Sequence, residues 1–301
     1  MVEDIEKILS NGFETYTKNL NLSIPIIIEV FSSGMVAAIM FVFGFLYIFG
    51  SSLESLKSTQ QPEEVIAIIL PLLTKHVAEI VLMIAVFIII VLFIQAFFMA
   101  GAIGMAQQAT ETGKSDLSTM ITAGKKNFVN MFLGELLVGL ISLAGIVFLV
   151  PGAMKVNFSE LMSSENSQGW LLLAGGLLLW VLYLLIISIT LAVFRFALVI
   201  DNLGPVESIT AGFEFFKKHK MDVLLLFLIV ITIAIIFMIL DQILGRIPVI
   251  ATIWSFISLI ISLIIIPPLT TVWWVRLYMA RTDKKLYFND LLIHPNDIPK
   301  L

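Results

Sequence analysis

The sequence predicts an all-α polytopic membrane protein with six transmembrane helices. Hydrophobic residues form 59% and charged residues 13% of the 301 residues, and the mean hydropathy is +1.03. Because an ordinary globular chain carries about 25% charged residues, these charges are too few to cover an aqueous surface. Six apolar runs reach the roughly 20 residues that a helix needs to cross a bilayer. No run alternates with the period of two that is typical of β-barrel strands.

The six predicted spans lie at about 22–49, 80–106, 128–150, 170–198, 221–243 and 249–278. Charged residues occupy the stretch before the first run, where a signal peptide would have an apolar core, so we expect an uncleaved membrane helix there. The segment "PEEVIAIILPLLTKHV" (62–77) predicts an outward extension of the second span, kinked at Pro71. The short connection "DQILGRIP" (241–248) makes the last two spans antiparallel neighbours, and Pro267 and Pro268 predict a kink in the last one.

Lysine and arginine predict which side of the membrane each connection faces. With the N-terminus placed inside, only four of the 18 Lys and Arg fall in outer loops, namely Lys57, Lys75, Lys155 and Arg246. Because cytoplasmic loops carry the excess of positive charge, both termini are expected to be cytoplasmic. The expected location is the cell membrane.

Three related segments predict an internal threefold repeat. They are "GFETYTKN" (12–19), "GKKNFVNM" (124–131) and "GFEFFKKH" (212–219), and the last two share the tetrapeptide "ITAG" that ends at their glycine. Each copy precedes an odd-numbered span on the predicted cytoplasmic side. We therefore expect a single membrane domain, 1–301, made of repeat units at about 1–110, 111–200 and 201–301.

An amphipathic helix is predicted around the glycine of each copy. Apolar residues recur at the spacing of one helical face: Ile5, Leu9, Phe13 and Tyr16; Leu117, Met120, Ile121 and Phe128; Val206, Ile209, Phe213 and Phe216. An apolar stripe flanked by lysine close to the membrane is typical of a helix in the cytoplasmic interface. The expected repeat unit is an interfacial helix, a helix going out and a helix returning.

The glycines and lysines of these segments are candidate functional positions. A glycine inside a helix costs about 1 kcal/mol relative to alanine, so Gly12, Gly124 and Gly212 indicate either close approach to a neighbour or a bend into the membrane. We expect them to be structural elbows. Lys217, Lys218 and Lys220, with Lys125 and Lys126, either solvate a polar helix face or contact lipid headgroups or a partner.

Polar residues inside a bilayer are expensive and are functional hypotheses by default. The predicted spans contain Glu29, Gln95, Glu135, Arg195 and Arg276. Both arginines lie near cytoplasmic ends, where we expect them to snorkel to the headgroups. The two acids lie deeper, and three interpretations stay open for them: an ion pair with Arg195 or Arg276, a substrate or proton site, and a protonated acid facing lipid.

The sequence offers no recognisable catalytic constellation. There is no cysteine, which excludes disulfides and Cys-ligated zinc. His76, His219 and His294 are widely separated and give no metal-ligand spacing. Neither a Walker phosphate loop nor a GxSxG motif occurs, and the basic residues form no stripe that would suit nucleic acid. We therefore expect no catalytic residue, cofactor, metal or nucleic-acid partner.

The segment "AVFRFALVIDNLGPVESITAGFEFFKKHKMDVLLL" (192–226) resembles the membrane domain that some bacteria fuse to glycerophosphodiester phosphodiesterases, and its stand-alone bacterial and archaeal relatives. Residues 99–140 fit the same scheme: a returning helix, a short turn, an amphipathic helix with a basic end, and the next span. The resemblance implies a six-helix membrane fold. It implies no catalytic residues, because the phosphodiesterase barrel is absent from this sequence.

Two functional hypotheses follow. The leading one is a non-enzymatic membrane scaffold or accessory protein that contacts lipid headgroups, or a membrane or cytoplasmic partner protein, through the repeated amphipathic segments. The alternative is a transporter or channel for a small solute or lipid that uses Glu29, Glu135 and Gln95 together with the kinked last span. The alternative requires these residues to converge on one cavity.

Overall fold

The computed structural model describes residues 3–50, 62–156 and 167–287. Within these ranges the regular structure is helical, without a β-strand. Six helical segments are long and apolar enough to cross a membrane, which confirms the all-α class and the number of predicted spans: Leu20–Phe49, Val77–Thr112, Leu117–Ala153, Gln168–Ile200, Lys220–Leu244 and Ile250–Arg281. The chain is therefore built as a multi-pass membrane protein.

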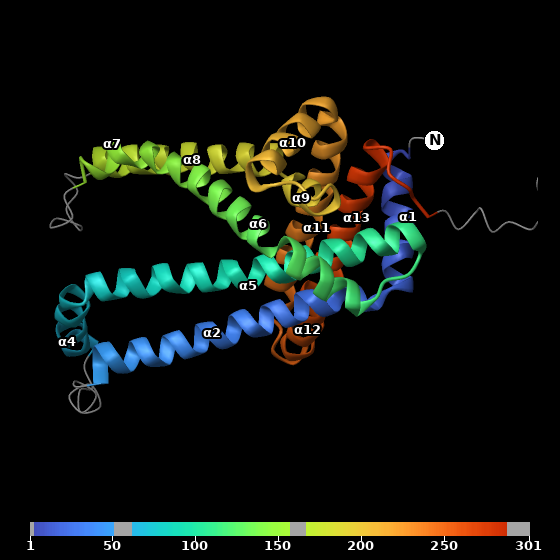
Figure 1. Ribbon diagram of the computed structural model, residues 1–301. Helices are drawn as coiled ribbons and strands as arrows, with labels where there is room; N and C mark the ends of the chain where they lie inside the picture. Colours follow the sequence, from blue (N-terminus) through green and yellow to red (C-terminus); the bar gives the residue numbers. More distant parts are fainter. Residues whose placement is uncertain (1–2, 51–61, 157–166, 288–301) are drawn as a thin grey trace, which may run out of the picture.

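The spans form three antiparallel hairpins in chain order. Their principal helices are α2 (Ile24–Phe49) with α5 (Val77–Thr112), α6 (Leu117–Ala144) with α8 (Ser167–Thr190), and α11 (Lys220–Leu244) with α12 (Pro248–Ile260). In Figure 1 the first two hairpins extend to the left of a packed body, whereas the third runs in another direction. The remaining elements are α1 (Ile5–Lys18), η1 (Leu20–Ser23), α4 (Pro62–Lys75), η3 (Gly145–Leu149), α7 (Val150–Ala153), α9 (Phe194–Ile200), α10 (Pro205–Lys218), η6 (Ile261–Ile265) and α13 (Ile266–Arg281).

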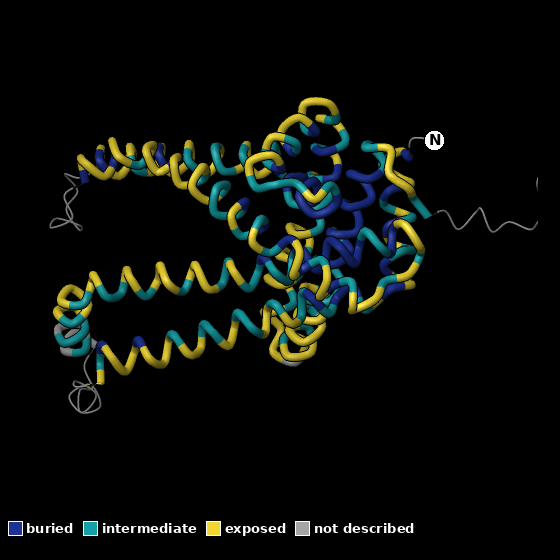
Figure 2. The backbone as a smooth tube through the Cα atoms, viewed as in Figure 1, coloured by how far each residue is buried: buried dark blue, intermediate teal, exposed yellow. Residues whose placement is uncertain are grey.

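The core lies at the end of the molecule that carries α1 and the end of α13. Most of its residues come from the second halves of the returning spans: residues 96–110 of α5, all of α9, and residues 268–279 of α13. Figure 2 shows these buried segments clustered, while the outer parts of the first two hairpins are mostly exposed or intermediate. Apolar side chains on the hairpins therefore need lipid, not protein, to remove them from water.

The predicted kink in the last span is present as a short π-helical segment, η6, directly before the two prolines. Pro268 has no N–H, so the carbonyl of Ile264 loses its usual helical donor. The hydroxyls of Tyr16 and Ser23 donate to that carbonyl at 2.8 and 2.7 Å. The break in the last helix is thus stabilised by the segment that joins α1 to α2.

Two expectations about helix boundaries were wrong. The outward extension is a separate helix, α4, and the break lies at His76 with Pro71 inside the helix. In the middle of the three related segments, the expected surface helix and spanning helix are one continuous helix, α6, from Leu117 to Ala144. The sequence also contains a glycosylation-acceptor pattern, "NFS" (157–159), and the segment "KKLYFNDLL" (284–292), which resembles the start of a fourth interfacial segment. The first lies outside the described residues, and so does the second after residue 287.

The three glycines are points of close packing and not bends. Gly12 and Gly212 lie inside α1 and α10, and those helices end six residues later at Lys18 and Lys218. A methyl group added to Gly12 would lie 2.5 Å from Trp273 in α13, and one added to Gly212 would lie 3.0 Å from the backbone of Phe194 in α9. The expectation of elbows is therefore wrong, and close approach is the reason for glycine.

Gly124 makes the same type of contact. A methyl group there would lie 3.0 Å from the ring and 3.1 Å from the carbonyl oxygen of Phe97 in α5. Each glycine thus faces an aromatic residue of a returning span: α6 packs on α5, α10 packs on α9, and α1 packs on α13. The first segment of the chain closes against the last.

Candidate functional site

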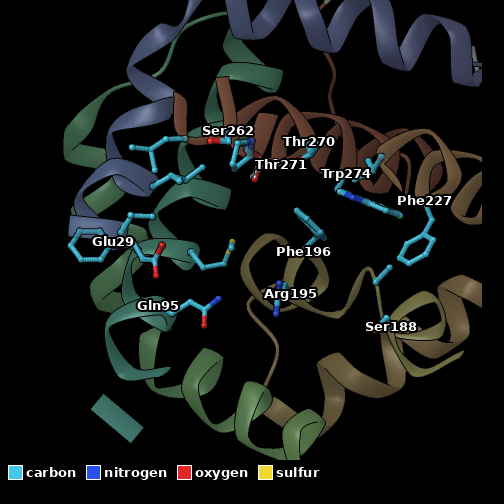
Figure 3. A pocket seen from close by; sticks show the side chains of 18 residues that line it. Glu29, Gln95, Ser188, Arg195, Phe196, Phe227, Ser262, Thr270, Thr271 and Trp274 are labelled. Carbon is cyan, nitrogen blue, oxygen red and sulfur yellow. Dashed lines mark hydrogen bonds between the residues drawn. The ribbon is translucent and has the colours of Figure 1, made fainter. Parts of the chain in front are cut away.

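A cavity of about 460 Å³ lies where the three hairpins meet, beside the core. Its walls come from α2, α5, α8, α9, α11, η6 and α13, so every hairpin contributes (Figure 3). The polar residues that line it are Glu29, Gln95, Ser188, Arg195, Ser262, Thr270 and Thr271. Four aromatic residues complete the walls: Phe98, Phe196, Phe227 and Trp274.

Three of the five intramembrane polar residues predicted from the sequence meet at this cavity. Glu29 and Gln95 lie on the same side of it in Figure 3, and Arg195 lies across from them. They belong to α2, α5 and α9, which are far apart in sequence. No local motif encodes this convergence, so it depends on how the hairpins pack.

Arg195 does not snorkel but forms an ion pair with Glu135 of α6. Its Nε donates to Oε1 of Glu135 in a very short hydrogen bond, and its Nη2 donates to Oε2 at 3.0 Å. The Glu135 side chain is only 10% exposed. Such a two-pronged pair is the geometry that guanidinium and carboxylate groups favour. Glu135 is therefore a paired acid, which was one of the three interpretations left open. The prediction that Arg195 snorkels to the headgroups was wrong.

Arg276 lies away from the cavity, inside the core. It is 1% exposed, and its Nε and Nη2 donate to the two carboxylate oxygens of Glu3 at 2.8 and 2.7 Å. Arg281 donates to the backbone oxygen of Glu3 at 2.6 Å and so fixes the same residue. The prediction that Arg276 snorkels to the headgroups was also wrong. Its partner could not be predicted from the sequence, because Glu3 precedes every predicted span.

Glu29 has no partner charge among the described residues. Its carboxylate accepts one hydrogen bond, from the hydroxyl of Ser33 at 3.3 Å. The side chain of Gln95 makes no hydrogen bond with the part of the chain that the structure describes. The cavity thus holds polar groups with unused hydrogen-bonding capacity, which is what a ligand site requires.

The hydroxyl groups at the kinked side of the cavity have their protons engaged. Thr270 and Thr271 donate to the backbone oxygen of Pro267 at 2.9 and 2.8 Å, and Ser262 donates to that of Leu259 at 3.1 Å. These hydroxyl groups can therefore accept hydrogen bonds from a ligand through their oxygen lone pairs, but they have no free proton to donate.

The predicted lysine contacts lie at two other surfaces. Lys217, Lys218 and Lys220 surround the break between α10 and α11, and the Lys217 ammonium lies 4.3 Å from the ring centroid of Phe213. Lys125 and Lys126 are exposed on α6. Lys126 lines a second polar cavity of about 460 Å³ together with Gln107, Gln108, Glu111, Asn127 and Asn202.

The break between α10 and α11 also holds His219. Its Nδ1 lies 4.0 Å from Asp222, whose carboxylate accepts from Arg281 at 2.7 Å. Burial lowers the pKa of His219 below its usual value of 6.5, and the positive charges of Arg281 and Lys218 act in the same direction against Asp222. Among the described residues, no three His, Asp or Glu side chains gather closely enough to hold a metal ion.

Comparison with known proteins places this architecture in a family. Residues 85–273 match the family described as Domain of unknown function (DUF7847). The chain belongs to this DUF7847 family. The matched residues include Gln95, Glu135 and Arg195 of the candidate site, and Gly124 and Gly212, but not Glu29.

The chain is also similar to an uncharacterized protein of Archaeoglobus fulgidus. It is 27% identical over 201 residues, which cover 64% of this chain and 66% of that protein. No solved structure matches the chain. Neither relationship refers to glycerophosphodiester phosphodiesterases, so that resemblance stays a prediction.

Proposed function

We propose that the chain is a non-enzymatic membrane protein that binds a small solute or lipid in the central cavity and transports it. The observation that carries the proposal is the convergence of Glu29, Gln95 and Arg195 from three helices on one cavity. A polar side chain in a span is costly unless it meets protein or water. Two of these groups keep unused capacity, and a cavity of this volume falls in the range of small-molecule sites.

The interrupted last helix supports the same proposal. Its π-helical segment and Pro267 lie on the wall of the cavity, and the π-helical segment packs against α2, the helix that carries Glu29. Broken helices with irregular backbone line the binding sites of many transporters. The break gives this side of the cavity a place where backbone geometry can change without disturbing the helix on either side.

Transport is tested with purified protein in liposomes. The liposomes are loaded with a mixture of small organic solutes, and the loss of each is measured by mass spectrometry; the exchange of fluorescent phospholipids between leaflets is followed by dithionite bleaching. Wild type is expected to exceed empty liposomes for at least one molecule. Ala192 lines the cavity, so Ala192→Trp should fill it with a large side chain and abolish this flux. Ala85→Trp, on the exposed face of α5, should not. Fluxes equal to those of empty liposomes would contradict the proposal.

A second candidate function, the scaffold that contacts headgroups, is supported by α10. Val206 and Phe213 are exposed there, on the side opposite the buried Gly212, and Lys217 and Lys218 follow at the end of the helix. An apolar surface beside lysines suits the interface of an anionic membrane. Hydrogen exchange of α10 should then be slower in nanodiscs of phosphatidylglycerol than of phosphatidylcholine. Changing Lys217, Lys218 and Lys220 to Glu should remove the difference; equal rates for wild type in both lipids would contradict this role.

The threefold repeat, the interfacial placement of α1 and α10, and the cytoplasmic position of both termini belong to the same proposal. The repeat is supported by the equivalent contacts of Gly12, Gly124 and Gly212 with Trp273, Phe97 and Phe194. The excess of Lys and Arg on the predicted inner side supports the orientation. Membrane lipids are the proposed partners at this surface, with a membrane or cytoplasmic protein as the further candidate.

A further inference from the structure

We propose that the central cavity selects an organic cation, a substituted ammonium group carried either by a lipid headgroup or by a free solute. The inference rests on the proposed function of the cavity, and it adds the chemical class of the ligand. Three features carry it: the balance of charge, the aromatic walls and the supply of hydrogen-bond acceptors.

The ionisable groups that line the cavity carry a net negative charge when Glu29 is ionised. Arg195 lines the cavity, but Glu135 already neutralises it through two hydrogen bonds. Glu29 has only the neutral hydroxyl of Ser33 as its partner. With the ion pair contributing no net charge, ionised Glu29 leaves the site one positive charge short. A cation that enters supplies this charge, whereas an anion would be repelled.

The walls suit a cation that is weakly hydrated. Phe98, Phe196, Phe227 and Trp274 come from four different elements and all line the same space as Glu29. The rings of Phe196 and Trp274 are stacked with centroids 6.2 Å apart. Aromatic faces attract cations, most strongly where water is excluded, and groups of aromatic side chains recognise alkylated ammonium ions. A small metal ion would keep its water and gain little from such walls.

The remaining polar groups are better acceptors than donors. Ser262, Thr270 and Thr271 spend their hydroxyl protons on backbone oxygens, so they present lone pairs to the cavity. The free donors are the amide of Gln95, the hydroxyl of Ser188 and the N–H groups of Arg195 that Glu135 does not use. An ammonium group beside Glu29 therefore meets its carboxylate and the amide oxygen of Gln95 as acceptors, and a polar tail directed at Arg195 meets donors.

The test compares a cation with its neutral isostere. Protein in phosphatidylglycerol nanodiscs is titrated calorimetrically with choline and with 3,3-dimethylbutanol, which has the same shape without the charge. Choline is expected to bind at least about tenfold more tightly, since a desolvated cation–π contact and an ion pair each contribute that order of affinity. Equal affinities would overturn the proposal.

Variants locate the preference in the cavity. Glu29→Gln keeps the shape and removes the charge, so the ratio of the two affinities should fall about tenfold, while Glu79→Gln at the far end of α5 should leave it unchanged. Trp274→Leu should lower choline affinity about three- to tenfold. Each variant must elute from size-exclusion chromatography like wild type. An unchanged ratio in Glu29→Gln would also overturn the proposal.

The lipid in the nanodisc distinguishes the two sources of the ammonium group. The comparison is made at high salt, which screens the surface charge of phosphatidylglycerol. If a lipid headgroup occupies the cavity, phosphatidylcholine nanodiscs should weaken the binding of added choline by competition; if a free solute does, the affinity should be the same in both lipids. Selective choline binding without flux in liposomes would leave this inference standing and remove transport. If Ala192→Trp blocks flux but choline and its neutral isostere bind equally, transport would stand and the preference for a cation would be overturned.

Discussion

Arg276 is a charged residue in the most buried part of the protein, and the carboxylate of Glu3 pairs with it. Removing two charges from water costs several kcal/mol per ion, and good geometry with additional hydrogen bonds offsets this cost. Glu3 supplies that geometry, and the bond from Arg281 to its backbone holds it in place. At the scale of the residue, this pair is structural, whereas Glu29 is the acid left free to act on something else.

Replacing Glu3 with Gln should remove the negative charge that pairs with the buried Arg276. The expected loss is roughly 3–5 kcal/mol of unfolding free energy, measured by denaturant unfolding in detergent. Glu14→Gln, at an exposed position of the same helix, should change stability by less than about 1 kcal/mol. The double variant Glu3→Gln with Arg276→Met should recover part of the loss. Equal stability of Glu3→Gln and wild type would contradict the role of the pair.

His219 predicts a dependence of stability on pH. Its folded pKa lies below the unfolded value of 6.5, so the unfolded chain binds more protons in the interval between the two. The stabilisation is therefore present above pH 6.5 and is lost as the pH falls towards the folded pKa. Between about pH 7.5 and about pH 5.5, wild type should lose more thermal stability than His219→Gln. Parallel curves for the two proteins would show that His219 does not contribute.

The membrane-spanning helices were predictable from the sequence, because the length of an apolar run is enough to identify each of them. All six spans follow from runs of apolar residues, although α5 extends to Thr112 instead of ending near residue 106. The junctions before the spans were less predictable. α1 and α10 end at Lys18 and Lys218, whereas α6 continues past the equivalent position at Asn130. Neither the apolar pattern nor the shared glycine distinguishes these cases, because tertiary packing decides them.

The glycine contacts predict opposite effects for the same substitution. Gly212→Ala places a methyl group 3.0 Å from the backbone of Phe194, and relief of this overlap should cost about 1–3 kcal/mol. Gly139→Ala in α6 meets no atom within 4 Å, so it should be neutral or gain up to about 1 kcal/mol from helix propensity. Thermal unfolding of both variants in the same detergent measures the contrast. A stabilised Gly212→Ala would show that α10 does not pack closely on α9.

At the scale of the whole molecule, the three hairpins diverge from a core placed at one end (Figure 2). The cavity lies where the hairpins diverge, so its lining comes from segments far apart in the sequence. Only part of that lining could be predicted. Glu29, Gln95 and Arg195 stand out in the sequence because each is costly in lipid. Phe98, Phe196, Phe227 and Trp274 do not, because the chain contains 23 Phe and five Trp and only packing selects the four that share this space.

The orientation of the molecule can be tested with single cysteines, since the natural chain has none. Lys218→Cys, at the end of α10, and Arg246→Cys, in the turn between α11 and α12, should react from opposite sides of the membrane. In intact cells a membrane-impermeant maleimide should label only Arg246→Cys, because positive charge stays inside. Labelling of Lys218→Cys in intact cells would reverse the proposed topology.

The contact between α1 and α13 has a consequence during translation. Glu3 and Arg276 are separated by 273 positions, which a ribosome at about 5–20 residues per second needs roughly 15–55 s to synthesise. During that interval the first two hairpins enter the membrane, but α1 cannot yet form its contacts with Trp273 and Arg276, because these residues have not been synthesised. The nascent protein therefore exposes an incomplete core until its last helix emerges, and chaperones or proteases that act on the early hairpins must do so within that time.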